Sequence, residues 1–399
     1  MSRNAANELK SAVKQLQPEL VRLRRDFHMR PELAFEEHET ARAIAEYLRG
    51  IGLEVTEGVG KTGVVGLLRG EWEGDSDRTL LIRADIDALP VTELNETDYR
   101  SRNPGVMHAC GHDGHIAVAL GVARLLADRH DRLRGHVKFA FQPAEERVGG
   151  AGPMIADGVL RDPAVTAAIG LHLWSSYHVG EIVVQAGPFF ASADEIHLTV
   201  RGRGGHGAMP HVTVDPIAVS AEIIVAMQTL VSREIAPLHA AVVTFGHING
   251  GTTGNVIADE VRLIGTVRAY EEADRAYLHR RIREVAQGIA STLRAEADVT
   301  IGPGIQACVN DPEITALMRR AAEATVGADH IPPGDQRQSV SDDMALFLDA
   351  VPGCYIMVGA GNPERGIDAP HHSARFDMDE ACLGIGAEVL TRAALDYLA

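Results

Sequence analysis

Four short segments rich in Cys, His and Glu, far apart along the chain, constrain what this sequence can fold into. The first, residues 106–115, holds one thiol, three imidazoles and one carboxylate. The others are residues 143–146, 170–172 and 370–373. Cys, His and Glu side chains bind borderline-soft divalent metals such as Zn²⁺ and Mn²⁺. Each segment stands where a strand is expected to give way to a loop or a helix. We therefore expect a fold that gathers these segments around one metal centre.

Alternating strands and helices predict an α/β layered domain at both ends of the chain. The expected elements are helices over 7–29, 36–49, 111–127 and 312–325, and strands over 63–68, 79–85, 136–141, 164–171 and 354–358. The segment 79–85 is a continuous apolar run that ends in charge, as a buried central strand does when it delivers side chains to a site. The segment 164–171 is a further apolar strand, expected to end at His172.

The middle of the chain follows a different pattern. Its expected elements are a strand over 195–200, a helix over 215–233, strands over 240–248 and 260–269, a helix over 273–297 and a strand over 298–301. This β-α-β-β-α-β order is the ferredoxin-like arrangement. We therefore expect residues 188–302 to form a domain inserted into a larger one, which consists of residues 1–187 and 303–399.

The composition narrows the class of protein. At 399 residues the chain exceeds what one core usually supports, so two domains are expected. The formal net charge of -17 argues against a nucleic-acid partner. The four cysteines form no CxxC pair and are expected to be reduced thiols. The polar N-terminus carries no secretory signal, and no uninterrupted apolar run reaches the ~20 residues of a membrane span. These features predict a cytoplasmic protein with no membrane partner.

Cys110 and His112 lie at the expected start of a helix, where free N–H groups and the positive end of the helix dipole favour a thiolate. A lone Cys is more often a small buried hydrophobe. Here Cys110 is two residues from His112 among tight-turn signals, which favours a ligand role. His108 and His115 stay open between hydrogen bonding to ligands and surface positions. Asp113 is either a helix N-terminal carboxylate or a group that orients a ligand.

Glu145 and Glu146 follow an expected strand and a proline. Adjacent carboxylates usually belong to a solvated loop. A hydrolytic metal centre, however, needs one carboxylate to hold metal and another to take a proton from metal-bound water. Beside the Cys/His cluster, the pair favours this second interpretation. His172 and His372, taken as isolated histidines, would more often be ordinary residues than ligands.

These motifs resemble those of the di-metal amidohydrolases that include hippurate hydrolases, bacterial N-acyl-amino-acid aminoacylases and plant auxin-conjugate hydrolases. The resemblance extends to the dinuclear zinc carboxypeptidases and spans nearly the whole chain. The matching segments are 83–90, 108–115, 142–146, 170–172, 204–211, 265–268 and 371–373. The resemblance implies a metallopeptidase-like catalytic domain with a mixed sheet. It also implies that the inserted ferredoxin-like domain serves as a lid or dimerisation domain, and hence a homodimer.

The resemblance implies two divalent metal ions per subunit, Zn or Mn, with Co or Ni also open. One ion would be held by Cys110, Glu146 and His372. The other would be held by Cys110, His112 and His172, so that the Cys110 thiolate bridges both ions.

The resemblance also implies roles for five further residues. Glu145 would be the general base, and Asp85 the carboxylate that orients a ligand. His206, offered by the smaller domain of a partner subunit, would face the developing oxyanion. Asn255 and Arg268 would bind substrate, with Arg268 holding the free carboxylate of an acyl amino acid. Without the resemblance, Asp85 would be an N-cap, His206 and Asn255 surface-loop residues and Arg268 a strand-edge charge.

Three positions depart from the wider pattern. Arg83 stands where many relatives of the carboxypeptidase branch have His, and Cys110 where they bridge with Asp. Both differences favour the thiolate-bridged aminoacylase branch. Residues 341–343, Ser-Asp-Asp, stand where that branch commonly has Ser-Glu-Asp. The shorter Asp342 side chain leaves the exact substrate open.

The expected function is hydrolysis of the amide bond of small-molecule N-acyl amino acids to a carboxylic acid and a free amino acid. A dipeptidase or carboxypeptidase is the closest alternative, because a peptide is also an acylated amino acid. Two other classes are open. A metal-dependent binding or sensing protein could dispense with Glu145 and His206, yet both are present. A thiol enzyme would use Cys110 as its nucleophile.

Overall fold

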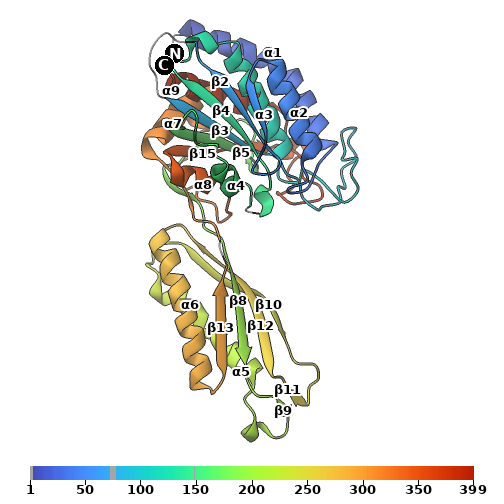
Figure 1. Cartoon of the computed structure of the whole chain (residues 1–399), viewed down its shortest axis with the longest axis vertical. Helices are drawn as coiled ribbons and strands as arrows, with labels where there is room; N and C mark the ends of the chain where they lie inside the picture. The colour runs from blue at the N-terminus through green and yellow to red at the C-terminus, as the bar shows by residue number, and fades with distance from the viewer. Residues whose placement is uncertain (1–2, 72–77, 148, 303) are drawn as a thin grey trace. The chain divides into compact units, whose positions relative to one another are not determined.

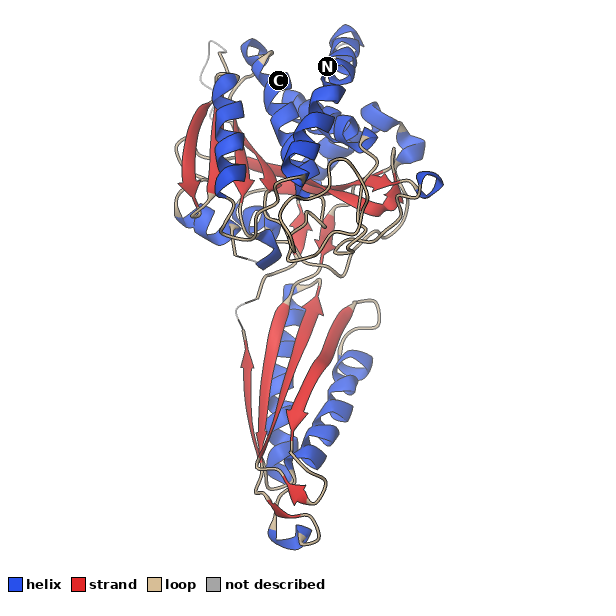
Figure 2. Cartoon of the chain, turned by 90° about the vertical axis from the view of Figure 1, so that its right-hand side faces the viewer, coloured by secondary structure: helices blue, strands red, loops and turns tan. Residues whose placement is uncertain are grey.

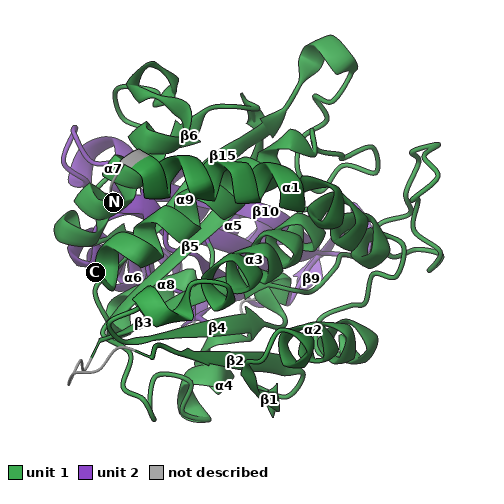
Figure 3. Cartoon of the chain, turned by 90° about the horizontal axis from the view of Figure 1, so that it is seen from above, with its two compact units in different colours: residues 1–187, 309–336, 342–399 green, residues 188–308, 337–341 purple. Residues whose placement is uncertain are grey.

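The chain divides into two compact units in the computed structural model, which describes residues 3–71, 78–147, 149–302 and 304–399. Unit 1 consists of residues 1–187, 309–336 and 342–399, and unit 2 of residues 188–308 and 337–341 (Figure 3). The expected second part of the larger domain begins at Pro303, which lies outside the described residues, as do Met1 and Ser2 of the polar N-terminus.

Unit 1 is built from helices and strands that alternate along the chain. Its α-helices are α1 (Arg3–His28), α2 (His38–Gly50), α3 (His112–Ala127), α4 (Ala151–Ala156), α7 (Pro312–Val326), α8 (Met344–Ala350) and α9 (Ala381–Tyr397). Its short 3-10 turns are η1 (His130–Arg132), η2 (Glu145–Arg147), η5 (Ala328–His330) and η6 (Pro363–Arg365). Its strands are β1 (Glu54–Val59), β2 (Gly63–Arg69), β3 (Thr79–Asp85), β4 (His136–Gln142), β5 (Ala167–His178), β6 (Ile182–Val183) and β15 (Gly353–Gly361). The strands β7 (Gly187–Phe190) and β14 (Cys308–Asn310) form a separate two-stranded sheet.

The sheet of unit 1 has seven strands in the order β1-β2-β4-β3-β5-β15-β6. Its centre, β4-β3-β5-β15, is parallel, while β1, β2 and β6 pair antiparallel to their neighbours. Helices α1, α3 and α9 pack on one another, and α3 and α9 also contact the sheet, which lies between helical layers (Figures 1 and 2). The α/β domain with a mixed sheet that the sequence predicts is therefore confirmed.

Parallel order at the centre of the sheet has a direct consequence for a site. Every residue of β3 is buried, because the apolar run is covered on both faces. The carboxyl ends of β3 and β4 lie side by side, with Asp85 paired in register with Gln142. Residues 85–87 lie at the end of β3, and residues 143–146 follow the end of β4. The side chains of these two segments are therefore brought together.

Unit 2 has an antiparallel four-stranded sheet in the order β10-β12-β8-β13, against which two helices pack. Its elements are β8 (Asp194–Arg201), β9 (Gly205–His206), η3 (Pro210–Val212), α5 (Pro216–Thr229), the π-helical turn η4 (Leu230–Glu234), β10 (Ala241–Gly250), β11 (Val256–Ile257), β12 (Glu260–Ala269), α6 (Glu272–Thr292) and β13 (Glu296–Ile301). Alternate residues of β8 are buried, as expected for a strand with one face against helices. The four main strands and two α-helices follow one another in the order β-α-β-β-α-β.

Some expected boundaries were wrong. β5 continues for six residues beyond His172, because it stays paired with β15 although its sequence turns polar after Trp174. α6 ends at Thr292, since β13 already begins at Glu296. The 19-residue helical segment Pro216–Glu234 contains an 18-residue window with a mean hydropathy of 1.2, of which 33% is buried, so by length and composition alone it could cross a membrane. A core helix of a soluble protein passes the same test, and the apolar runs of the sequence predicted no membrane span.

Candidate metal centre

A sharp turn brings the thiol of Cys110 and the imidazole of His112 to the same place. Gly111 between them has a φ of 90°, in the left-handed region that glycine tolerates best. It is the N-cap of α3, whose first residue is His112. The loop therefore enters the helix with Cys110 immediately before it. The tight-turn signals of the sequence correspond to this bend.

Two sets of three ligand atoms share the Cys110 sulfur. The atoms of Cys110, Glu146 and His372 lie within 4.8 Å of one another, as do those of Cys110, His112 and His172. Cys110 Sγ is 3.6 Å from His172 Nε2, and Glu146 Oε1 is 3.3 Å from His372 Nε2. The structure thus brings together the five residues that the resemblance implies as ligands, in the two groups that it implies.

The hydrogen bonds of two imidazoles leave the ring nitrogen that faces the cluster free to bind a metal. His112 Nδ1 donates to the backbone carbonyl of Asp87 at 2.9 Å, and His172 Nδ1 donates to that of Leu173 at 2.8 Å. In its neutral form each ring then carries its lone pair on Nε2, the arrangement that metal-binding histidines need. His112 Nε2 is buried and has no hydrogen-bond partner among the described residues. Buried polar atoms are normally paired, so this nitrogen fits a ligand of a bound ion.

The charge of the cluster also fits cations. Burial and the neighbouring Glu146 and Glu145 raise the pKa of the Cys110 thiol well above its usual value. The expectation that the helix N-terminus favours a thiolate is therefore wrong when only the protein groups around Cys110 are considered. Burial disfavours a charged imidazole, but Asp85, Asp87 and Glu146 outweigh it and raise the pKa of His112 to about 10. Divalent ions would supply the positive charge that these carboxylates lack.

Asp85 and His115 form a buried pair behind the ligands. Asp85 is the last residue of β3 and accepts from His115 Nδ1 at 2.5 Å and from Arg83 Nη1 at 2.7 Å. The backbone amide of Leu173 donates to His115 Nε2 at 2.9 Å, which fixes the neutral tautomer. Asp85 Oδ2 lies 3.7 Å from His112 Nε2. The interpretations of Asp85 as an N-cap and of His115 as a surface residue are therefore wrong.

Asp113 and His108 are also buried. Asp113 accepts from Arg24 Nε and pairs with His28 Nδ1, both at 2.8 Å, so it ties α3 to α1 and does not orient a ligand. Burial lowers the pKa of His108 to about 3, which leaves its ring neutral. Neither nitrogen of that ring has a hydrogen-bond partner among the residues that the structure describes. The surface interpretation of His108 is wrong.

Glu145 is buried in η2. The interpretation of Glu145 and Glu146 as residues of a solvated loop is therefore wrong for Glu145. Its carboxylate lies 4.0 Å from His112 Nε2. Burial and the nearby Asp342, Glu146 and Asp343 raise the pKa of Glu145 well above its usual value. A carboxylate with a raised pKa is suited to accept a proton near neutral pH.

A buried arginine connects the ends of β3 and β4. The sequence had not predicted this role. Arg83 donates through Nε to Gln142 at 2.8 Å and through its two Nη atoms to Asp85 at 2.7 Å and Asp343 at 3.0 Å. Its Nη2 also lies 3.0 Å from Asp342 Oδ1. Arg83 and Asp342, the residues at two positions that depart from the wider family pattern, thus belong to one charge network. The only signal in the sequence was a charge at the end of an apolar strand.

Three predicted residues lie in unit 2. His206 in β9 pairs in register with Val256 of β11, next to Asn255, whose carbonyl accepts from Gly207 N at 2.8 Å. The amide of Ala208 donates to His206 Nδ1 at 3.1 Å, which leaves the proton on Nε2, where it could be donated to an oxyanion. Arg268 lies on β12, an interior strand, and donates to Ser341 Oγ at 3.1 Å, so the strand-edge interpretation is wrong.

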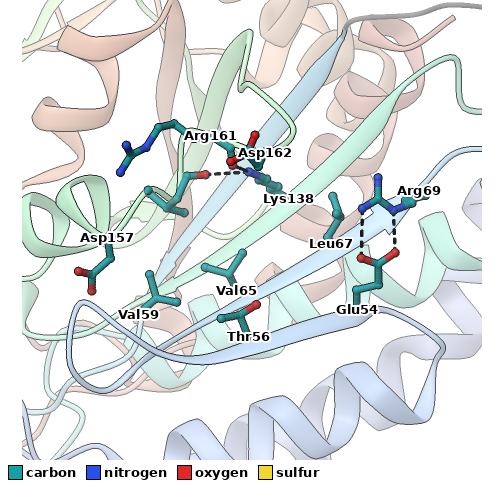
Figure 4. A pocket seen from close by; sticks show the side chains of 12 residues that line it. Glu54, Thr56, Val59, Val65, Leu67, Arg69, Lys138, Asp157, Arg161 and Asp162 are labelled. Carbon is teal, nitrogen blue, oxygen red and sulfur yellow. Dashed lines mark hydrogen bonds and ion pairs between the residues drawn. The ribbon is translucent and has the colours of Figure 1, made fainter.

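A separate hollow of about 390 Å³ lies against β1, β2 and β4 of unit 1 (Figure 4). Four of the charged residues that line it, Glu54, Arg69, Lys138 and Asp157, are already engaged by the protein. Lys138 Nζ donates to the carbonyl of Val159 at 3.1 Å, and Asp157 accepts from Gly60 N at 2.7 Å. Arg69 donates to both carboxylate oxygens of Glu54, at 2.6 and 3.2 Å. The metal-ligating types of side chain gather elsewhere, at the ends of β3 and β4.

Comparison with known proteins identifies the family. A sequence profile of Peptidase family M20/M25/M40 matches residues 81–396. The chain is 37% identical over 384 residues to Thermostable carboxypeptidase 2 of Saccharolobus solfataricus, covering 95% of each chain. It is 38% identical over 368 residues to the N-acetyl-L-cysteine deacetylase of Bacillus subtilis, covering 92% of this chain and 85% of the relative. The solved Bacillus subtilis YXEP protein, described as a dinuclear metal binding peptidase from the M20 family, matches with a TM-score of 0.84 and 32% identity over 96% of this chain and 99% of that chain.

The chain belongs to peptidase family M20/M25/M40. It is a hydrolase that acts on amide bonds. The resemblance to aminoacylases and carboxypeptidases that the sequence motifs carry is confirmed.

Proposed function

We propose that this protein is a metal-dependent hydrolase that cleaves N-acyl amino acids into a carboxylic acid and a free amino acid. One observation carries the proposal: the buried Glu145 carboxylate stands beside two sets of ligand atoms that share the Cys110 sulfur. A relative that removes an acetyl group from N-acetyl-L-cysteine, itself an N-acyl amino acid, supports this substrate class.

In this proposal two divalent ions, Zn or Mn with Co or Ni as alternatives, would be held by the five residues Cys110, His112, Glu146, His172 and His372. Bound ions of this kind lower the pKa of a water ligand from ~16 to ~7. Glu145 takes the proton of the attacking water and returns it to the leaving amine. Asp85 keeps the cluster oriented through His115 and Arg83.

Residues of unit 2 would contact the substrate. His206, offered by the smaller domain of a partner subunit with its proton on Nε2, would stabilise the oxyanion, and Asn255 would bind the substrate. Arg268 would hold the free carboxylate in a charge-assisted pair. We propose that unit 2, residues 188–302 in the sequence-based division, acts as a lid and dimerisation domain. Apolar side chains on its surface, such as Val225 (67% exposed) and Ile217 (44% exposed), support self-association into a homodimer. A cytoplasmic location without nucleic-acid or membrane partners completes the proposal.

The decisive experiment is an activity screen of metal-stripped protein supplied with Zn²⁺, Mn²⁺, Co²⁺ or Ni²⁺ in turn, against acetyl- and benzoyl-amino acids. The Glu145→Gln variant should keep its metal but lose turnover by ~10²–10⁴-fold. Glu46→Gln, a change on the exposed face of α2, is the matched control and should retain full activity. Full activity of Glu145→Gln would refute the assigned base.

A carboxypeptidase or dipeptidase is the second candidate, favoured by the likeness to a thermostable carboxypeptidase. Comparing kcat/KM for an acetyl-amino acid with that for a dipeptide separates the two. Activity that resists chelators but is blocked by a thiol alkylator would instead favour Cys110 as nucleophile. The raised pKa of the Cys110 thiol argues against that mechanism, since the thiolate is the nucleophile.

A further inference from the structure

The turn that carries Glu145 and Glu146 is held by its own backbone amides. Glu145 N donates to Asp87 Oδ1 at 3.0 Å, and Glu146 N donates to Asp87 Oδ2 at 3.1 Å. Both oxygens of one buried carboxylate are therefore used on two consecutive peptide groups. Charge-assisted hydrogen bonds of this kind are about twice as strong as neutral ones. They set the direction in which the two Glu side chains leave the backbone.

A second buried carboxylate holds the residue before them. Ala144 N donates to Glu37 Oε1 at 2.9 Å, and Thr62 Oγ1 donates to Glu37 Oε2 at 2.5 Å. Glu37 is fully buried. Ala144 has a φ of 53°, in the left-handed region, which is unfavourable for an alanine because its Cβ approaches the following carbonyl oxygen. Such a conformation persists only where the surroundings enforce it, and Glu37 supplies that constraint.

A third carboxylate closes the segment. Asp343 Oδ2 accepts from Gly150 N at 3.2 Å and from Ala151 N at 3.0 Å, at the start of α4. Backbone amides at both ends of the segment 144–151 thus donate to buried acidic side chains. The side chains come from three distant parts of the chain, so the contacts are specific to the folded state.

Asp87 also contacts the metal-ligand cluster. Its backbone carbonyl accepts from His112 Nδ1 at 2.9 Å, and its Oδ1 lies 3.3 Å from the same nitrogen. One residue therefore orients a candidate ligand through its carbonyl and aims the Glu145–Glu146 turn through its carboxylate. A shift of Asp87 would move both together.

We propose that Asp87 and Glu37 are positioning residues that hold the turn 144–146, so that Glu146 reaches the metal cluster and Glu145 reaches the attacking water. The roles of the two glutamates rest on the proposed function. The placement of the turn does not, because it follows from hydrogen bonds among the described residues. Misplacement of a reacting group by about 1 Å costs ~10²-fold in rate.

The first test needs no activity. Hydrogen exchange of metal-free protein, read on peptides covering residues 143–147, reports the protection of the three amides. Asp87→Asn can accept through one oxygen only, so exchange of the Glu145 or Glu146 amide should quicken roughly 10- to 100-fold. Glu37→Ala should do the same for the Ala144 amide. Glu37→Gln keeps one acceptor oxygen and should restore protection, and Thr62→Val, which removes only the hydroxyl that contacts Glu37, should leave it unchanged.

The second test uses metal binding and kinetics. Titration calorimetry with Zn²⁺ should show affinity for one ion reduced about 10- to 100-fold in Asp87→Asn, as is usual when a group behind a ligand is changed. With an N-acyl amino acid, kcat should fall about 100-fold while KM changes less than about 2-fold, because the base is displaced but the substrate-binding residues are not.

The outcomes separate the two proposals. If wild-type protein hydrolyses no N-acyl amino acid, the proposed function fails, while hydrogen exchange still decides the role of Asp87 and Glu37. Unchanged exchange at residues 144–146 in Asp87→Asn overturns the inference, even if metal is lost, since Asp87 would then act through His112 alone. If Asp87→Asn does not fold, the comparison of Glu37→Ala with Glu37→Gln decides: equal exchange in both variants overturns the inference.

Discussion

Replacing Arg83 by methionine should destabilise unit 1 severely. The guanidinium is fully buried and donates to Asp85, Asp343 and Gln142 at 2.7–3.0 Å, with Asp342 also within 3.0 Å. The methionine side chain has nearly the same length but no charge. Three buried carboxylates would then face one another without their common cation.

The expected loss follows from the burial of this network. Removing one partner of a buried ion pair costs roughly 3–5 kcal/mol, because the remaining charge is left uncompensated in a dry environment. The three contacts are not additive, so we expect about 4 kcal/mol rather than three times that value. The matched control is Arg69→Met, which removes the exposed ion pair with Glu54 and should cost less than about 1 kcal/mol.

Urea unfolding of metal-free protein, followed by tryptophan fluorescence, measures both changes. With an m-value of about 3 kcal/mol/M, Arg83→Met should lower the midpoint by about 1–1.5 M, and Arg69→Met by less than about 0.3 M. The cost of Arg83→Met should also shrink as the pH falls toward 4, since unpaired buried carboxylates take up protons readily. Equal midpoints for the two variants, or a cost that does not depend on pH, would refute the assigned charge compensation.

Other consequences concern pH, metal content and thiols. Although burial opposes it, Arg24 and His28 hold the pKa of Asp113 well below its usual value, so its contribution to stability is present above about pH 4 and is lost as the pH falls further. In acid unfolding followed by circular dichroism, the free energy of unfolding should therefore fall more steeply below about pH 4 in wild type than in Asp113→Asn. Parallel curves for the two proteins would contradict this. Cys110→Ser should bind fewer metal ions per subunit than wild type by elemental analysis, whereas Cys382→Ser, a change in the core, should bind as many. Cys354 is fully buried whereas Cys110 is partly exposed, so in metal-free protein a thiol reagent should modify Cys110 well before Cys354, and simultaneous modification would show that the core opens.

The fold could be predicted wherever a local sequence pattern was compatible with only one type of secondary structure. β3 has the predicted bounds, 79–85, because its apolar run is bounded by charge at both ends. β5 could not be bounded in this way, because the residues after Trp174 are mostly polar and stay in the strand only through pairing with β15, more than 180 residues away. α9 was not predicted at all, since Gly384 and Gly386 weaken its helical pattern and its buried position depends on contacts with α1, α3 and α7.

The candidate site shows the same division. The side chains that can bind a divalent ion belong to a few residue types, so candidate ligands such as Cys, His and Glu can be recognised in a sequence. The groups that orient those side chains can be any donor or acceptor. At His112 the orienting group is the backbone carbonyl of Asp87, which every residue possesses. Asp85 and Asp87 stand two positions apart in one motif, yet Asp85 pairs with His115 whereas Asp87 accepts from Glu145 and Glu146. Because the chain leaves the strand between these two aspartates, strand periodicity cannot assign their partners. Candidate ligands can thus be predicted from residue type, whereas positioning residues require coordinates.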